Sequence, residues 1–260
     1  MNGKVYFIGA GPGEAELITV KGQRIINQAD LILYAGSLVP KELFATTTVP
    51  CLDSATMTLS ETHAIVSQCA QKGGIVARVH TGDPTLFGAL REQIALLNED
   101  GIAWEVIPGV TAACAAAARG GISFSLPEVS QSLILTRVAG RTPMPETESI
   151  ESLATHGCSM AIYLAGKLVP QLVAALRKAG RPEHNPILCA HRVGFKDEVV
   201  VMTTLAELEH IVSTASLERQ TVFLVLPPHL NEQHNSRLYA SDFSHTYRNA
   251  DCTKKERSQR

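Results

Sequence analysis

The most constraining feature of this sequence is a glycine-rich loop directly behind its first predicted strand. The apolar run Val5–Ile8 leads into the loop Gly9–Glu14, with the sequence GAGPGE, and a helical pattern opens at Leu17. A dinucleotide fingerprint would place a third glycine at position 14, so that a pyrophosphate can approach the backbone. Glu14 would repel a phosphate there, and Pro12 removes a backbone amide. The loop therefore predicts a close-approach site for a ligand other than a pyrophosphate.

The composition excludes several broad classes of protein. The chain has 260 residues, is 45% hydrophobic and carries a net charge of −2, so nothing favours a nucleic-acid or membrane partner. No apolar stretch is long enough to span a bilayer and no secretory signal is visible, so we expect a cytoplasmic protein. The six cysteines show no paired spacing, and we expect free thiols and no metal site. Buried thiols are expected at Cys69, Cys114, Cys158 and Cys189.

Predicted strands and helices alternate over the first 120 residues, which favours a mostly parallel sheet in an α/β fold. Ser60 is placed to cap the second of the helices. The strands are expected at Val5–Gly9, Leu31–Tyr34, Ile75–His80 and Trp104–Ile107, and the helices at Leu17–Ala29, Ser60–Gln71, Gly88–Asn98 and Val110–Arg119.

The stretch Gly120–Pro127 breaks this alternation and is expected to link two α/β domains. The second half mixes hairpin-like neighbours with crossovers, so we expect a mixed sheet. Its strands are predicted at Ser132–Val138, Met160–Leu164, Ile187–His191, Val199–Met202 and Val222–Leu226, and its helices at Leu168–Ala179 and Leu205–Ser213. We place the domains at residues 1–120 and 121–250, followed by a disordered tail at 251–260.

Three strand-to-helix junctions in the first half share one design. The loop Gly9–Glu14 is the first, Thr81–Pro84 the second and Pro108–Ala112 the third, each directly after a predicted strand. Open α/β sheets bind ligands at the carboxyl ends of their strands. Each turn alone is commonplace, but three of them in adjacent crossovers predict a binding crevice.

The common catalytic motifs are absent: there is no serine elbow, no Gly-Lys-Ser/Thr phosphate loop and no His-Glu-x-x-His helix. His80 and His191 each end an apolar strand, and Asp83 and Asp53 lie in turn-like settings, where structural roles are the ordinary explanation. Methyl transfer from a sulfonium donor requires little from side chains, because the donor is already activated and the protein mainly aligns and desolvates the reactants. Carbonyl oxygens at strand ends suit such a cation.

In order and spacing, the segments Ile8–Thr19, Gly82–Gly88 and Ile107–Ala112 resemble the tetrapyrrole methylase family, and the resemblance extends from residue 4 to about 250. It implies two α/β domains with the active site in the cleft between them, S-adenosylmethionine as methyl donor, and a homodimer. The family usually has Asp where this chain has Glu14. Carried over from the family, the cofactor contacts are Pro12, Gly82, Asp83, Leu86, Thr111, Ala112, Leu164, Val193, Thr221 and Val222.

A finer resemblance concerns the ring substrate. The segments Leu33–Val39, Asp53–Leu59 and Ser236–Arg248 are similar to the branch that acts on precorrin-4 or cobalt-precorrin-4 in cobalamin biosynthesis. This implies methylation of carbon 11, with the electron-rich ring as nucleophile and any cobalt carried inside the substrate. The branch adds Tyr34, Ser37 and Asp53 as substrate residues. The ring carboxylates call for cations, and the candidates near predicted strand ends are Arg78, Arg137, Arg141, Lys167 and Arg192.

No catalytic base is assigned; cofactor positioning is the favoured role of Asp83, and proton acceptance is its alternative. Three other functions stay open. A sister methylase acting on another ring carbon would share the three loops. A nucleotide-dependent oxidoreductase is a remote alternative, against which Glu14 and Pro12 argue. A protein that binds tetrapyrroles without transferring a methyl group is the third.

Overall fold

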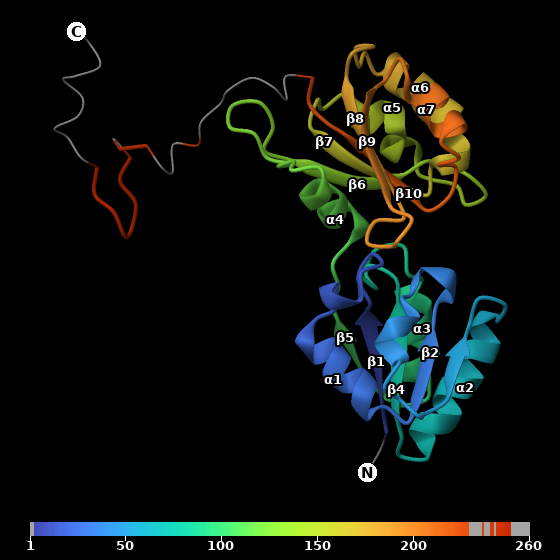
Figure 1. Ribbon diagram of the computed structural model, residues 1–260. Helices are drawn as coiled ribbons and strands as arrows, with labels where there is room; N and C mark the ends of the chain where they lie inside the picture. Colours follow the sequence, from blue (N-terminus) through green and yellow to red (C-terminus); the bar gives the residue numbers. More distant parts are fainter. Residues whose placement is uncertain (1–2, 229–235, 237–239, 242, 251–260) are drawn as a thin grey trace, which may run out of the picture. The chain divides into compact units, whose positions relative to one another are not determined.

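The computed structural model describes residues 3–228, 236, 240–241 and 243–250, and the chain forms two five-stranded sheets (Figure 1). It divides into two compact units. The first takes the chain up to Gly121 together with Cys189–Val201 and Gln220–Val222, and the second takes the remainder. The tail predicted at 251–260, with Cys252, lies outside the described residues.

The sheet of the first unit is parallel throughout, as the alternating pattern predicts. Its strand order is β3-β2-β4-β1-β5, and each neighbouring pair runs in the same direction. The edge strand β3 was not expected, because it has only three residues and alternates between exposed and half-buried positions. The strands are β1 (Lys4–Gly9), β2 (Leu31–Tyr34), β3 (Cys51–Asp53), β4 (Ile75–His80) and β5 (Ala103–Ile107).

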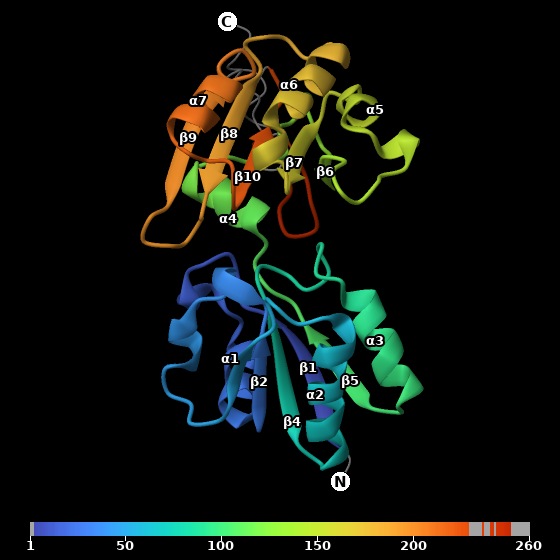
Figure 2. The ribbon, with the colours of Figure 1, turned by 90° about the vertical axis from the view of Figure 1, so that its right-hand side faces the viewer.

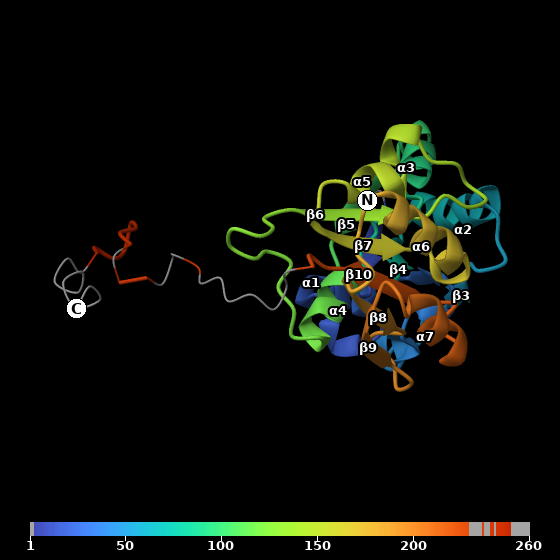
Figure 3. The same cartoon turned by 90° about the horizontal axis from the view of Figure 1, so that it is seen from above.

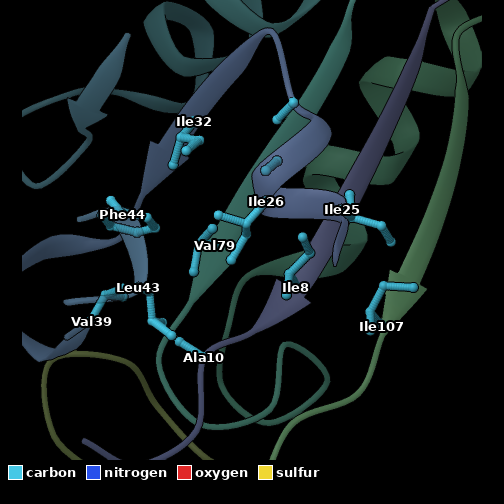
Figure 4. Close-up of a cluster of buried hydrophobic side chains, with 12 residues drawn as sticks. Ile8, Ala10, Ile25, Ile26, Ile32, Val39, Leu43, Phe44, Val79 and Ile107 are labelled. Atoms are coloured by element: carbon cyan, nitrogen blue, oxygen red, sulfur yellow. The ribbon is translucent and has the colours of Figure 1, made fainter. Parts of the chain in front are cut away.

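Helices cover both faces of this sheet (Figure 2). Alternate strand residues point to opposite faces, so Ile8 packs with α1 while Phe7 packs with α2 and α3. On the α1 face the core also includes Phe44 and Ile107, as Figure 4 shows. These helices are α1 (Val20–Gln28), α2 (Leu59–Gln71) and α3 (Leu90–Glu99); a fourth helix, α4 (Ala112–Arg119), follows the third loop.

The predicted helix starts were wrong by one to three residues, and the caps explain why. Helix α1 begins at Val20 because the Thr19 hydroxyl accepts a hydrogen bond from the Gly22 amide, 3.1 Å away. Helix α2 is capped by Thr58 and not by Ser60. The Thr58 hydroxyl accepts from the Glu61 amide, while the Glu61 carboxylate accepts from the Thr58 amide, which is a capping box.

The second sheet is mixed, as predicted. Its order is β6-β7-β10-β8-β9; β6 and β7 are parallel, whereas β7 and β10 are antiparallel. Helices α5, α6 and α7 lie side by side along one face of it (Figure 3). The strands are β6 (Leu133–Arg137), β7 (Ser159–Tyr163), β8 (Pro186–His191), β9 (Val199–Thr204) and β10 (Thr221–Val225); the helices are α5 (Ile150–Ala154), α6 (Val169–Lys178) and α7 (Leu208–Thr214).

The cysteines divide into two groups. Cys158 and Cys189 are buried, and burial raises the pKa of the Cys189 thiol to about 12. Cys114 is exposed and Cys69 is only partly buried, so the prediction of four buried thiols was wrong for these two. Cys114 faces outward because the alanines of α4 take its buried face. None of the helices in the described part of the chain is long and apolar enough to cross a membrane.

Candidate functional site

The three predicted loops meet at the carboxyl ends of β4, β1 and β5, which are neighbours in the first sheet. Gly11 and Gly82 exchange backbone hydrogen bonds, with N–O distances of 3.3 and 2.7 Å. A Cβ on Gly109 would lie 2.2 Å from the Gly82 carbonyl oxygen, and one on Gly9 would lie 2.6 Å from the Gly109 Cα. Because no side chain fits at these contacts, the loops pack backbone against backbone.

The Asp83 carboxylate fastens the second loop to the third. One oxygen accepts from the Thr85 amide at 2.8 Å and from its hydroxyl at 2.5 Å, and the other accepts from the Gly109 amide at 2.9 Å. Burial raises the pKa of Asp83, but the hydrogen bonds from Thr85 and Gly109 outweigh it and hold the pKa below the ordinary value of 3.8. An ionised carboxylate with its oxygens so engaged favours a positioning role over proton transfer.

At Gly82 the backbone of these loops has open space beside it. Gly82 has a left-handed backbone, with φ of +62°, and a Cβ built there would meet nothing closer than the Val110 carbonyl oxygen and the Thr111 Cα, both at 4.0 Å. Helix α4 begins here, at Ala112, with Thr111 as its N-cap. An open position flanked by a carbonyl oxygen suits a sulfonium cation, so the residues present fit S-adenosylmethionine.

Strained backbone marks other predicted contacts. Leu164, in the second unit, has a φ of 55° and is 69% exposed. In the first unit, Arg192 and Gln220 have φ values of 47° and 55° and immediately precede the predicted contacts Val193 and Thr221. Non-glycine residues rarely adopt this conformation, which costs about 1–3 kcal/mol and is concentrated at ligand sites. These three strained residues thus lie at or next to cofactor contacts predicted from the sequence.

The other predicted cofactor residues differ in exposure. Leu86, Thr111 and Ala112 are half-buried. Pro12, Val193, Thr221 and Val222 have buried side chains. These four would therefore meet a ligand through their backbone atoms.

Glu14 takes part in an ionic network that the sequence did not reveal. Its carboxylate accepts a hydrogen bond from Arg119, at the end of α4, at 2.9 Å. The same guanidinium lies 3.4 Å from Glu198, which also accepts from the Gly194 amide at 2.6 Å. A Cβ on Gly194 would lie 2.4 Å from the Glu14 nitrogen, so the segment around it packs directly on the glycine loop within the first unit.

The predicted substrate residues of the first unit gather at the carboxyl ends of β2 and β3. Tyr34 ends β2 and is half-buried, and Asp53 ends β3 and is exposed. One Asp53 oxygen accepts from the Gly36 amide at 3.1 Å and from the Ala55 amide at 2.9 Å. Ser37 lies in the short turn that follows β2, and its side chain is outside the described part of the structure.

The predicted arginines are placed differently from one another. The prediction that Arg78 meets the ring carboxylates was wrong. Arg78 is only 7% exposed, because position 78 of β4 points to the α2–α3 face of the sheet and not beyond the strand end. Arg137 donates to carbonyl oxygens of its own loop, at Thr142 and Pro143. Arg192 donates to Asp197 and stacks on a phenylalanine ring. Arg141 and Lys167 are exposed.

The C-terminal stretch predicted from the finer resemblance, Ser236–Arg248, falls partly outside the described residues. Its described end forms a tight turn in which the His245 and Arg248 backbones exchange hydrogen bonds. The Arg248 guanidinium donates to the Ala240 carbonyl oxygen at 2.9 Å.

Comparison with known proteins agrees with this geometry. Residues 4–209 match the model of the Tetrapyrrole (Corrin/Porphyrin) Methylases. The chain is 39% identical over 251 residues to a cobalt-precorrin-4 C(11)-methyltransferase of Priestia megaterium, covering 94% of this chain and 97% of that one. It is 43% identical over 249 residues to a precorrin-4 C(11)-methyltransferase of Pseudomonas aeruginosa, covering 94% and 98%.

A solved structure is similar as well. The X-ray structure of a cobalt precorrin-4 methyltransferase superposes with a TM-score of 0.84 at 39% identity, covering 86% of this chain and 95% of that one. Its likeness extends the sequence match to the two-sheet architecture. The converging glycine loops, the sequence match and this fold lead to one conclusion: the chain belongs to the tetrapyrrole methylase family.

Proposed function

We propose that this chain is an S-adenosylmethionine-dependent methyltransferase that methylates carbon 11 of precorrin-4 or cobalt-precorrin-4 in cobalamin biosynthesis. The observation that carries the proposal is the junction where the loops of Gly9, Gly82 and Gly109 meet backbone to backbone. The names of the relatives at 39% and 43% identity favour carbon 11 as the position and a precorrin-4 ring as the substrate.

The methyl donor, when bound, supplies an already activated methyl group. The chain then has to hold the donor, orient the ring and keep water away. Asp83 fixes the second loop to the third through Thr85 and Gly109, so the backbone groups that line the crevice stay in place. No side chain needs to form a covalent bond, because the electron-rich ring is itself the nucleophile.

The ring would be held by the substrate residues predicted from the sequence. Tyr34, Ser37 and Asp53 supply polar groups at the ends of β2 and β3. Arg137 and Arg192 would pair with ring carboxylates, with Arg192 exchanging its present partner Asp197 for the substrate. The proposal also includes the division into domains at 1–120 and 121–250 and a homodimer. Light scattering on the purified chain would test the homodimer.

The experiment is a turnover assay on the full chain with S-adenosylmethionine carrying a ¹³C methyl group and enzymatically prepared precorrin-4 or cobalt-precorrin-4. We expect one S-adenosylhomocysteine released per ring and the label on carbon 11, located by NMR. Label on another carbon would identify a sister methylase. Ring binding without S-adenosylhomocysteine release would indicate a binding protein.

Calorimetry separates the remaining alternative. S-adenosylhomocysteine should bind to the purified chain, and NADPH should not. Binding of NADPH without binding of S-adenosylhomocysteine would mean that the three loops serve a nucleotide-dependent oxidoreductase, and the proposal would fail.

A further inference from the structure

Arg78 is a buried charge whose hydrogen bonds go to neutral groups. Its guanidinium donates to the Gln93 side-chain oxygen at 3.0 Å, to the Ser54 hydroxyl at 2.9 Å and to the Leu33 carbonyl oxygen at 3.3 Å. Burial lowers the pKa of Arg78 to about 10, against a smaller opposing effect of the Asp53 charge, so the group stays charged at neutral pH. Burying a charge is costly, which calls for an explanation of its place.

One branch of these contacts leads to the predicted substrate residues. The Ser54 hydroxyl accepts from Arg78 and donates to the Tyr34 carbonyl oxygen at 3.0 Å, and the Ser54 amide donates to the same oxygen at 3.0 Å. Arg78 also holds the Leu33 carbonyl one residue earlier. The guanidinium thus fixes the end of β2 against Ser54, the residue that follows β3.

The other branch leads to the segment behind the second glycine loop. The Gln93 amide group donates to the Ala89 carbonyl oxygen at 2.9 Å and to the Gly88 carbonyl oxygen at 3.4 Å. Ala89 has a left-handed backbone, with φ of 48°. Gly88 packs closely on Pro84: a Cβ on Gly88 would lie 2.4 Å from the Pro84 carbonyl oxygen. Gln93 therefore holds residues 88 and 89 in place, directly behind the second loop, which contains the predicted contacts Gly82 and Leu86.

The cavity beside this cluster does not explain it. Arg78 and Gln93 line a cavity of about 10 Å³ together with Phe7, His63 and neighbouring apolar side chains. That volume admits at most about one water molecule. The polar groups therefore serve no ligand of their own.

We propose that Arg78 is a positioning residue for methyl transfer, which holds the ring-side ends of β2 and β3 and the donor-side loop in register through Ser54 and Gln93. The inference rests on the proposed function, because it assigns Tyr34 and Asp53 to the ring and the second loop to the methyl donor. Misplacement of reacting groups by about 1 Å can cost about 100-fold in rate, so a rigid link between the two sides has a catalytic use.

The first test removes one hydroxyl and keeps the guanidinium. Ser54→Ala should raise the KM for the ring about five-fold and leave the Kd of S-adenosylhomocysteine unchanged, because the lost hydrogen bond holds only the ring side. Ser67→Ala is the matched control. Ser54 and Ser67 are 8% and 7% exposed, both lie in the first unit, and Ser67 bonds to His63 and Asp100 outside this cluster. The control should change thermal stability without changing the KM.

The second test changes the link itself. Arg78→Lys keeps the charge but loses the planar fork that reaches Ser54 and Gln93 together. It should raise the KM for the ring and the Kd of S-adenosylhomocysteine, each about five-fold or more. If this variant does not fold, the comparison of the two serine variants decides.

The outcomes separate the inference from the function on which it rests. An unchanged KM in Ser54→Ala, or equal KM changes in Ser54→Ala and Ser67→Ala, would overturn the positioning role while wild-type turnover upholds the methyltransferase. A wild-type chain that binds S-adenosylhomocysteine but methylates no precorrin ring would overturn both.

Discussion

Two buried arginines, one in each unit, hold strand ends: Arg78 acts at the carboxyl ends of β2 and β3, and Arg181 acts at the amino end of β7. Arg78 is 7% exposed and Arg181 is 6% exposed. Arg181 donates to the carbonyl oxygens of Ala154 at 3.2 Å, Gly157 at 3.3 Å and Cys158 at 2.7 Å. Burial lowers the pKa of both guanidinium groups. Both residues are therefore buried charges whose hydrogen bonds go to neutral groups.

The two arginines differ in which end of the strands they hold. The carbonyl of Cys158 directly precedes β7, so Arg181 fastens the amino end of that strand. The predicted contact Leu164 follows the carboxyl end of the same strand. Arg78 acts on Leu33 and Ser54, at the carboxyl ends of β2 and β3. Because ligands of open α/β sheets bind beyond the carboxyl ends of the strands, we expect Arg78 to affect the site and Arg181 to affect stability.

The largest effect should come from adding a methyl group where the loops touch. Gly109→Ala should weaken S-adenosylhomocysteine binding by at least about 1,000-fold, or about 4 kcal/mol, because its Cβ would lie 2.2 Å from the Gly82 carbonyl oxygen. Gly140→Ala is the control in the second unit, since its Cβ would meet only the flexible Leu168 side chain, at 3.3 Å. Calorimetry should find that variant within about two-fold of wild type. Near-normal binding by Gly109→Ala would contradict the assignment of the cofactor site to this junction of loops.

An intermediate effect is expected at the amino end of β7. Arg181→Met should lower the free energy of unfolding by about 3 kcal/mol, because three carbonyl oxygens lose their donor. The KM for the ring should not change at temperatures where the variant is folded. Urea unfolding and steady-state kinetics would check both. If Arg181→Met raised the KM as much as Arg78→Lys, the proposed difference between the carboxyl-end and the amino-end arginine would be wrong.

The smallest effect should come from neutralising the Asp83 carboxylate, which joins the second loop to the third. Asp83→Asn keeps an acceptor for Gly109 but cannot also accept from the Thr85 amide, so S-adenosylhomocysteine should bind about ten-fold more weakly. The folded pKa of Asp83 lies below 3.8, so its stabilising contribution is present above that pH and is lost as the pH falls through the folded pKa. Wild-type affinity should therefore be flat from about pH 5 to 8 with respect to this group. An acid-side loss that persists in Asp83→Asn would implicate another group.

Much of the fold was predictable because the sequence marks it locally. Turn residues at the three junctions and the alternation of apolar strand segments with helical segments indicate the parallel sheet. The errors occur where two local signals compete or where an element is very short. Thr58 and Ser60 both suit an N-cap, and only the partner Glu61 selects Thr58. Strand β3 has three residues, too few to show a period.

The site was less predictable, because some of its contacts join distant parts of the chain. Glu14 and Arg119 are 105 residues apart, and no local pattern connects them. The burial of Arg78 did have a signal. In the strand Ile75–His80 it shares a face with Val76, so the period of two already directs it toward the apolar core.

The discontinuity of the first unit has a consequence for how the protein is made. A Cβ on Gly13 would lie 2.4 Å from the Phe195 ring, so this late segment completes the packing around the first glycine loop. At about 5–20 residues per second, a ribosome needs roughly 4–15 s to extend the chain from Gly121 to Phe195. During that interval the late segment has not been synthesised, so the first glycine loop lacks the Phe195 ring that packs on it. A chain truncated after Gly121 would remain in that unfinished state permanently.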